Sequence, residues 1–280
     1  MVPISVVMIS QNEGHIIEKT FKSIEGLTDD IILVDSGSTD DTLAIAKKYK
    51  ATIIKSPWYG YGKNKNIGIS KSKYHWILSL DADEVIDEQL FKTLTHKTFF
   101  NENIIYRFRF SVLIGNVRLK YGCGTIKKIR IFNKKKAKWN NDLLHESLVY
   151  NDKMKIEELK GNVHHYSYRN INHYMQKMQN YTTLSAGQMH LKNKKATFTK
   201  IYINPVYSFI INYIFRFGFL DGFWGFTFAK ISTYSSFFKY IKLKELNDIG
   251  INYNTPTKMQ HETSSHPKKG PATLDKKTYC

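Results

Sequence analysis

The sequence predicts an α/β fold with a mostly parallel central sheet flanked by helices. Short apolar runs alternate with segments of helical spacing over residues 1–100, which is typical of βαβ units. The most informative run is Trp76-Ile77-Leu78-Ser79-Leu80, which predicts a buried strand and is followed at once by Asp81 and Asp83.

The other elements of this first part follow from the same two patterns. Further buried strands are predicted from apolar runs at residues 4–9, 31–34 and 52–54. A helix is predicted near residues 16–27, where apolar residues recur at helical spacing, and another short helix near residues 64–70. Ser38 and Asp41 have the spacing of a capping box, which predicts another helix start between the second and third strands.

Carboxylates follow two of these strands. Asp81 and Asp83 are two residues apart, and side chains at this spacing point to one side of an extended segment. Two such carboxylates repel unless a cation lies between them, and hard divalent ions such as Mg²⁺ or Mn²⁺ suit oxygen ligands. The same pattern also occurs in solvated loops. Asp35 follows the strand at 31–34, so it is expected in the same crevice at the carboxyl ends of the strands.

The part of the chain after residue 100 has a different pattern. Alternating apolar and polar residues over 104–112 predict a half-buried strand whose outer face carries Arg107 and Arg109. Residues 129–132 are another candidate strand. A helix is predicted over about 170–192, with one side formed by Tyr174, Met178, Tyr181 and Leu184.

The composition limits the classes of function. The 280 residues, 42% of them hydrophobic, are enough for a sizeable core. A formal net charge of +18 favours anionic partners such as nucleic acid, acidic lipid or phosphorylated substrates. Cys123 and Cys280 do not form a disulfide framework, so a reducing compartment is expected. The apolar start lacks the basic region of a signal peptide and predicts a first strand.

The segment 201–243 is unusually rich in apolar and aromatic residues. Polar residues interrupt it too often for a membrane-spanning helix; they include Pro205, Asn212, Arg216, Asp221 and Lys230. Either a helical subdomain packed on the sheet or helices in a membrane interface fit this pattern, and the flanking lysines suit anionic headgroups.

Three domains are therefore predicted. Residues 1–195 form the sheet domain, whose sequence pattern changes at about residue 100. Residues 196–248 form a helical, membrane-associating extension, and residues 249–280 form a disordered polar tail.

Three motifs together resemble a known family. Val34-Asp35-Ser36-Gly37-Ser38-Thr39-Asp40-Asp41-Thr42 is similar to the nucleotide-binding signature of family 2 glycosyltransferases, whose fold is called GT-A and has a Rossmann-like sheet. Leu78 to Glu84 resembles their metal-binding Asp-x-Asp segment. Gly62 to Gly68 lies between the two, where that family has a basic residue and an Asn near the diphosphate.

Later motifs resemble the bacterial lipopolysaccharide core glucosyltransferases of the β-1,4 type. They are Arg130-Ile131-Phe132, Leu144-His145-Glu146, His165-Tyr166-Ser167-Tyr168-Arg169 and Gly218-Phe219-Leu220-Asp221-Gly222, within a match of roughly residues 4–246. The resemblance implies an inverting transfer of glucose from UDP-glucose to an inner-core heptose. Relatives that act on capsule, lipid-carrier or protein acceptors share several of these motifs.

The resemblance implies a nucleotide-binding half of the sheet domain, residues 1 to about 100, and an acceptor-binding half, residues 101–195. It also implies roles for individual residues. The nucleotide-sugar site would comprise Ser10, Asn12, Glu13, Asp35, Ser36, Gly37, Lys65, Asn66 and Asp81. Asp83 would hold Mg²⁺ or Mn²⁺ with Asp81 and His165. Lys65 stands where the family often has Arg, so the charge is kept but bidentate phosphate contact is lost.

The general base is predicted in a compact group of an imidazole and two carboxylates. Many family 2 enzymes use a Glu-Asp pair about a hundred residues after the first signature, and this chain has no such pair there. Glu146 is the predicted base, His145 is expected to orient it or to be structural, and Asp142 to position the loop.

The partners implied are a UDP-sugar donor and a lipid-linked oligosaccharide acceptor. These place the protein in the cytoplasm, in peripheral contact with the anionic inner membrane. The charge alone also allows a nucleic-acid-binding module, although the scattered lysines show no basic and aromatic face. A nucleotidyltransferase, which releases pyrophosphate, is a further alternative.

Overall fold

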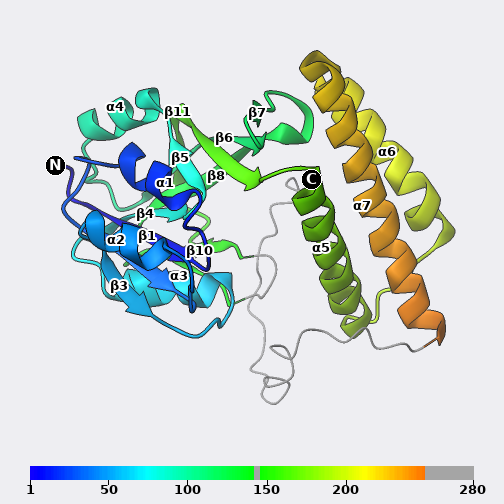
Figure 1. Cartoon of the computed structure of the whole chain (residues 1–280), viewed down its shortest axis with the longest axis horizontal. Helices are drawn as coiled ribbons and strands as arrows, with labels where there is room; N and C mark the ends of the chain where they lie inside the picture. Colours follow the sequence, from blue (N-terminus) through cyan, green and yellow to red (C-terminus); the bar gives the residue numbers. More distant parts are fainter. Residues whose placement is uncertain (142–145, 250–280) are drawn as a thin grey trace. The chain divides into compact units, whose positions relative to one another are not determined.

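The computed structural model describes residues 1–141 and 146–249 of the chain (Figure 1). These residues form two compact units, which we call the sheet unit (residues 1–118 and 125–169) and the helical unit (residues 119–124 and 170–249). The predicted tail, apart from Ile249, lies outside the described residues, as do Asp142 and His145.

The four strands predicted in the first part form the parallel half of one sheet. They are β1 (Ile4–Ser10), β2 (Ile31–Asp35), β3 (Thr52–Lys55) and β4 (Trp76–Asp81), in the order β3-β2-β1-β4. All three neighbouring pairs are parallel. The α/β fold predicted from the alternating pattern is confirmed.

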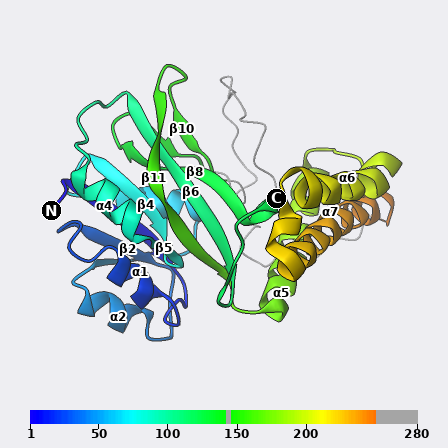
Figure 2. The ribbon, with the colours of Figure 1, turned by 90° about the horizontal axis from the view of Figure 1, so that it is seen from above.

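The sheet continues beyond β4 with strands of mixed direction. The order is β4-β8-β6-β11-β5, and β7 pairs with β6. Their bounds are β5 (Glu84–Ile86), β6 (Ile104–Ile114), β7 (Val117–Arg118), β8 (Thr125–Asn133) and β11 (Lys155–Tyr168). The long strands β8, β6 and β11 lie side by side in the view from above (Figure 2). A separate pair is formed by β9 (Ala137–Trp139) and β10 (Leu148–Tyr150).

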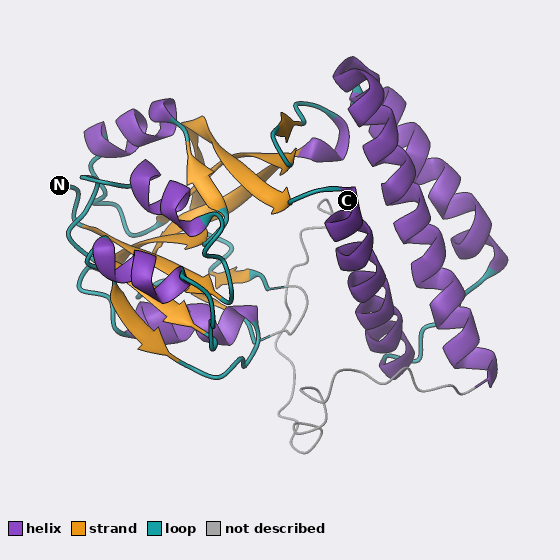
Figure 3. Cartoon of the chain, in the orientation of Figure 1, coloured by secondary structure: helices purple, strands orange, loops and turns teal. Residues whose placement is uncertain are grey.

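Helices cover both faces of the parallel half, because successive side chains of a strand point to opposite faces (Figure 3). Val6 and Met8 of β1 belong to one core, which contains residues of α1 (Ile17–Ser23), α2 (Thr42–Lys48) and α4 (Glu88–His96). Val7 and Ile9 belong to a second core, against α3 (Tyr61–Ser70) and β9. The carboxyl ends of the strands are therefore held between two packed layers.

Two local predictions were wrong. The predicted capping box is absent, because the Asp41 side chain caps nothing and the Ser38 hydroxyl donates to Asp35 instead. The helix expected over residues 16–27 ends at Ser23. The alternation predicted for β6 is confirmed at Phe108, Arg109 and Phe110, where only Arg109 is exposed.

The helical unit has three long helical segments. These are α5 (Ile171–Leu191), the continuous segment 199–215, and α7 (Gly222–Ile249). The segment 199–215 consists of α6 (Asn204–Ile210) between two π-helical turns, Thr199–Ile203 and Ile211–Phe215. Short 3₁₀ turns cover Gly122–Gly124 and Gly218–Asp221. In the described part of the chain, no helix is long and apolar enough to cross a membrane.

Helix α5 belongs to the helical unit, whereas the predicted boundary at residue 195 placed it with the sheet. Its buried residues are Tyr174, Met178, Thr182 and Ala186, so a stripe of four-residue spacing faces inward. Ala186 packs against Leu243 and Leu246 of α7. Tyr181, predicted on the inner side, is 46% exposed because it lies one position off this stripe.

Candidate active site

The strand ends that carry the predicted carboxylates meet at one edge of the sheet. In the register of the parallel strands, Ser10 pairs with Asp35 and Ile9 pairs with Asp81. Asp35 and Asp81 are therefore the last residues of the two strands on either side of β1. Both aspartates thus lie at the carboxyl edge of the parallel strands, and the expected shared crevice stays a prediction.

Asp35 organises the loop that follows its own strand. Its side chain is 1% exposed. One carboxylate oxygen accepts from the backbone N–H groups of Gly37 (3.0 Å) and Ser38 (2.8 Å), and the other accepts from the hydroxyls of Ser10 (2.9 Å) and Ser38. A carboxylate has about four acceptor sites, and these donors fill them. Asp35 thus holds the loop in place, rather than pointing an open carboxylate at a ligand.

The loop after β1 is tied to the loop after β2. The Asn12 amide oxygen accepts from the Thr39 N–H at 2.8 Å, and the Asn12 N–H donates to the Ser38 hydroxyl at 2.8 Å. The Glu13 N–H donates to Thr42 Oγ1 at 2.9 Å. Asn12 adopts φ 58° and Gly37 φ 95°, left-handed conformations that Asn and Gly tolerate best. The predicted binding residues of these loops therefore form one connected layer.

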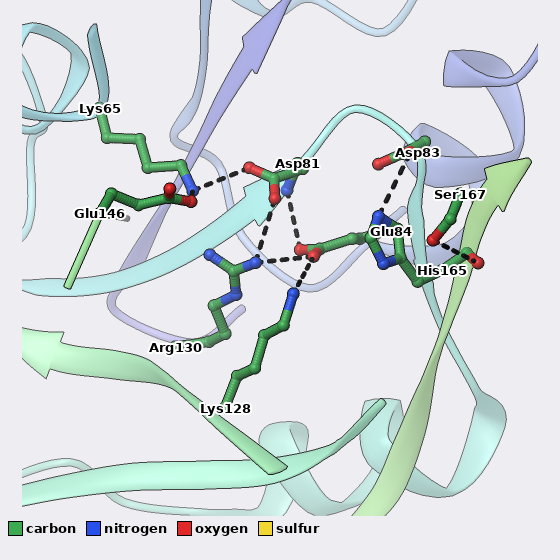
Figure 4. Close-up of polar contacts among 9 residues, drawn as sticks. All are labelled: Lys65, Asp81, Asp83, Glu84, Lys128, Arg130, Glu146, His165 and Ser167. Carbon is green, nitrogen blue, oxygen red and sulfur yellow. Dashed lines mark hydrogen bonds and ion pairs between the residues drawn. The ribbon is translucent and has the colours of Figure 1, made fainter. Parts of the chain in front are cut away.

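Lys65 is the centre of the charged part of the site (Figure 4). It comes from α3, its side chain is fully buried, and its ammonium lies 2.9 Å from Asp81 Oδ1 and 3.3 Å from Glu146 Oε1. The same ammonium lies 4.7 Å from the centre of the Trp139 ring. A buried cation requires such partners. Lys65 thus joins a predicted nucleotide residue to the predicted base, which lie far apart in the sequence.

Arg130 reaches the same site through an irregularity in β8. Tyr106 of β6 pairs with Ile131 whereas Arg107 pairs with Ile129, so Arg130 is the extra residue of a β-bulge. Bulges re-aim side chains in this way. The Arg130 guanidinium lies 3.0 Å from Asp81 Oδ2 and 2.7 Å from Glu84 Oε1.

Glu84 completes this buried network. It is fully buried, and its second oxygen accepts from the Asp81 N–H at 2.9 Å. Burial acts to lower the pKa of the Arg130 guanidinium, but the charges of Glu84 and Asp81 outweigh burial and raise it above its ordinary value. Arg130 therefore stays charged and fixes both carboxylates.

The electrostatic environment keeps Asp81 ionised. Burial by itself acts to raise the pKa of this carboxyl. The neighbouring cations outweigh burial and hold the pKa well below its ordinary value; they are Lys65, Arg130 and Lys128. The pKa of Lys128 is lowered, first by burial and then by the charge of Arg130. The three cations and the carboxylates of Asp81, Glu84 and Glu146 therefore form one buried charge network at this strand end.

Asp83 does not lie beside Asp81 on one side of an extended segment, as the spacing predicted. Strand β4 ends at Asp81, and residues 82 and 83 form a turn that leads into β5. The Thr20 hydroxyl holds this turn by donating to the Ala82 carbonyl at 2.7 Å. Asp83 Oδ2 lies 3.3 Å from His165 Nε2, whereas Asp81 contacts Lys65 and Arg130 (Figure 4). The positive charges next to Asp81 are therefore those of the Lys65 and Arg130 side chains.

Asp83 offers a carboxylate, the kind of ligand that a hard divalent ion prefers. The Asp83 carboxylate and the His165 imidazole are adjacent, and their side chains are 14% and 21% exposed. Within residues 1–141 and 146–249, no group of three or more His, Cys, Asp or Glu side chains is placed to hold a metal by itself. Mg²⁺ commonly takes only one or two carboxylates and completes its shell with water and substrate phosphates, so a small protein donor set is consistent with it.

The two asparagines of α3 have separate tasks. Asn66, a predicted binding residue, donates to the Trp139 carbonyl (2.9 Å) and accepts from the Trp139 N–H (3.1 Å), so it holds β9. The fully buried Asn64 donates instead to the Ser36 hydroxyl at 3.1 Å. Asn64 thus connects α3 to the Asp35 loop. It was not among the predicted site residues.

Sequence reasoning also gave no role to Glu84, Lys128, Arg130 and Trp139. Glu84 directly follows the Asp-x-Asp motif, and Arg130 begins the motif Arg130-Ile131-Phe132. The sequence therefore offered a signal for both residues. Nothing local in the sequence marks Lys128 or Trp139, because their position depends on the register of β8 and the pairing of β9.

Comparisons with known proteins show the family of the chain. The model of glycosyl transferase family 2 matches residues 5–170. An uncharacterized glycosyltransferase of Rickettsia prowazekii (strain Madrid E) is 30% identical over 292 residues, which cover 96% of this chain and 100% of the relative. The chain therefore belongs to glycosyl transferase family 2, and it is a glycosyltransferase with the GT-A fold.

Two further similarities are more distant. The lipopolysaccharide core biosynthesis glycosyltransferase LpsC of Rhizobium meliloti (strain 1021) is 25% identical over 272 residues, covering 92% of this chain and 98% of LpsC. A structure of glucosyl-3-phosphoglycerate synthase from Mycobacterium tuberculosis with Mg²⁺ and UDP is 24% identical, with a TM-score of 0.32. That similarity covers 40% of this chain and 43% of the synthase chain.

Proposed function

We propose that this glycosyltransferase moves glucose, with inversion, from UDP-glucose to a hydroxyl of the lipopolysaccharide inner core. The observation that carries the proposal is the junction at Lys65. One buried ammonium there contacts both Asp81, at the end of a central strand, and Glu146. The acceptor is supported by the motifs of the second half and by the similarity to LpsC over nearly the whole chain.

The donor's nucleotide is proposed to bind over the connected loops after β1 and β2. Ser10, Asn12 and Glu13 supply the first loop; Asp35, Ser36 and Gly37 supply the second. Asp35 fixes the backbone of Gly37 and Ser38, so this surface is rigid before ligand binds. A rigid site avoids the ordering cost of binding.

The diphosphate is proposed to lie between Lys65 and the Asp83–His165 pair. Asp83 and His165 would hold Mg²⁺ or Mn²⁺ there, with Asp81 contributing or contacting the ribose. Such an ion supplies Lewis-acid stabilisation of the leaving diphosphate. Lys65 adds a point charge, and Arg130 keeps Asp81 ionised and in place.

Glu146 is proposed to take the proton of the acceptor hydroxyl. Its side chain is 22% exposed, so the carboxylate is accessible while one oxygen contacts Lys65. A base must lie within hydrogen-bond reach of the proton that it removes. Asp142 and His145 lie outside the described residues, and their expected supporting roles stay predictions. The lipid-linked acceptor places the proposed site of action at the cytoplasmic face of the inner membrane.

One assay tests the whole proposal. The purified chain is incubated with a panel of UDP-sugars and truncated core oligosaccharides, and products are identified by mass spectrometry. We expect UDP and a glucosylated core with UDP-glucose. Glucosylation of only capsule, lipid-carrier or protein acceptors would overturn the acceptor assignment.

A variant pair tests the base. Glu146→Gln keeps size and hydrogen bonding but removes the basic oxygen, so turnover should fall by about 10²–10⁴-fold while UDP-glucose binding persists. The matched control is Glu88→Gln, an 81% exposed carboxylate that pairs with Lys92 in α4; its turnover should not change. Near-normal turnover of Glu146→Gln with inactive Asp142→Asn would assign the base to Asp142 instead.

A further inference from the structure

The outer side of the helical segment 199–215 is apolar and exposed. Its residues recur at helical spacing, and their exposure ranges from 36% at Ile210 to 64% at Tyr207. We call this surface the apolar face; it comprises Tyr202, Ile203, Val206, Tyr207, Ile210 and Ile214. The opposite side of the same segment is used for packing, since Ile201, Pro205 and Asn212 are buried. α6 itself lies alongside α7 (Figure 1).

The charges around this face are distributed as an interfacial helix requires. Between Lys200 and Arg216 the segment has no charged residue. That is about 15 residues, or roughly 22 Å of helix, which is shorter than a membrane span. A helix with an exposed apolar side and cationic ends lies in the plane of a bilayer interface. Aromatic residues with a polar end, such as Tyr202 and Tyr207, favour the headgroup level.

The surrounding sequence is almost free of acids. From Lys192 to Lys244 the sole acidic residue is Asp221. Its carboxylate accepts from the backbone N–H groups of Lys120 and Tyr121, so it is used inside the helical unit. Basic residues precede and follow the apolar face: Lys192, Lys194, Lys195, Lys200, Arg216 and Lys230. Such clusters are attracted to anionic lipid surfaces.

We propose that the apolar face lies in the interface of a bilayer that contains anionic headgroups. The alternative occupant is a second copy of the chain. A two-fold contact through this face places the same surface of both copies together, which brings two basic surroundings into contact and is opposed by charge. A bilayer covers the apolar side chains and neutralises the lysines at once.

Binding to a bilayer would bring the enzyme to its lipid-linked acceptor, so this inference deepens the proposed function. Only that biological role rests on the proposed function. Its test is lipid binding, measured without donor or acceptor. A transferase that fails to bind lipid removes this inference alone. A lipid-binding protein without core glucosylation removes the proposed acceptor alone.

The experiment is co-sedimentation of the full chain with vesicles. One set contains phosphatidylcholine only, and the other contains phosphatidylcholine mixed with phosphatidylglycerol. We expect binding to the anionic vesicles that weakens as salt is raised, because exposed charges are screened. The double variant Ile203→Glu with Ile210→Glu should reduce binding at least about tenfold, since it places two carboxylates on the surface that enters the interface.

Two controls complete the design. Phe100→Glu changes a 79% exposed aromatic residue of the sheet unit and should bind as the unaltered chain does. Lys200→Glu should weaken binding to anionic vesicles by about fivefold or more and leave phosphatidylcholine binding unchanged. Circular dichroism confirms that each variant is folded.

The proposal is overturned if the unaltered chain binds neither vesicle, or if the double variant binds as well as Phe100→Glu. Analytical ultracentrifugation identifies the alternative. Self-association that the double variant abolishes, without lipid binding by the unaltered chain, would assign the apolar face to a second copy.

Discussion

Two aspartates end central strands at the same edge of the sheet, and they are held in opposite ways. Asp35 is fixed by hydroxyl and backbone donors, most of them from the three residues after it. Asp81 is fixed by cations that lie on α3 and β8, far away in the sequence. The first arrangement is local and neutral, whereas the second is long-range and charged.

The difference indicates what each strand end can do. The acceptor sites of Asp35 are filled by nearby donors, most of them from its own loop. A ligand there would contact the loop that Asp35 holds in place and not the carboxylate itself. A carboxylate held by cations keeps ammonium and guanidinium groups at its strand end, and such groups pair with phosphate oxygens. The two ends therefore suit the two halves of a nucleotide sugar, and the following predictions test that division.

The largest effect on activity is expected at Asp83, just beyond the end of β4. Asp83→Ala should lower transfer by about 10⁴-fold, because Lewis-acid stabilisation of a leaving group is worth several kcal/mol. EDTA should have a similar effect on the unaltered protein. Mn²⁺ binding measured by calorimetry should be lost in the variant and kept in Asp152→Ala, which changes an exposed turn residue. Full activity in EDTA would contradict the metal assignment.

The next effect concerns stability. Arg130→Met removes the guanidinium that contacts Asp81 and the fully buried Glu84. Breaking a buried pair leaves an uncompensated charge, so the free energy of unfolding should fall by about 3–5 kcal/mol in urea denaturation.

Two companion variants separate charge from packing. Arg109→Met changes an exposed arginine of β6 and should alter stability by less than about 0.5 kcal/mol. Adding Glu84→Gln to Arg130→Met should recover part of the loss, because it removes the orphaned charge. If the double variant is no more stable than Arg130→Met, packing and not charge explains the effect.

The smallest effect is expected at Asp35, at the end of β2. Asp35→Asn replaces acceptor capacity with an N–H group that faces donors, so it should cost about 1–3 kcal/mol and weaken UDP binding by about tenfold. Turnover at saturating donor should change less, because uridine contacts are alike in the ground and transition states. Asp41→Asn, whose side chain does not cap its helix, is the control. An unchanged UDP dissociation constant for Asp35→Asn would show that the loop does not bind uridine.

Local pattern was sufficient for most of the parallel half of the sheet. Strands β1, β2 and β4 are mostly buried apolar runs that period and length identify, whereas the short β3 is partly exposed. The segment Asp81 to Asp83 was harder, because a rule for extended chains was applied where the chain turns at residue 82. The Ser38–Asp41 pattern failed for a related reason, since a nearby buried carboxylate competes for the Ser38 hydroxyl.

The sequence alone determined the α/β class, the order of the strands along the chain, the family, and the presence of carboxylates at two strand ends. These properties depend on residues that are neighbours in the chain. Only the tertiary structure decided which charges meet. Lys65 contacts Glu146 across 81 positions, and Arg130 reaches Asp81 across 49 positions through a bulge in β8. Such contacts depend on register and packing between distant segments, and no local spacing specifies them.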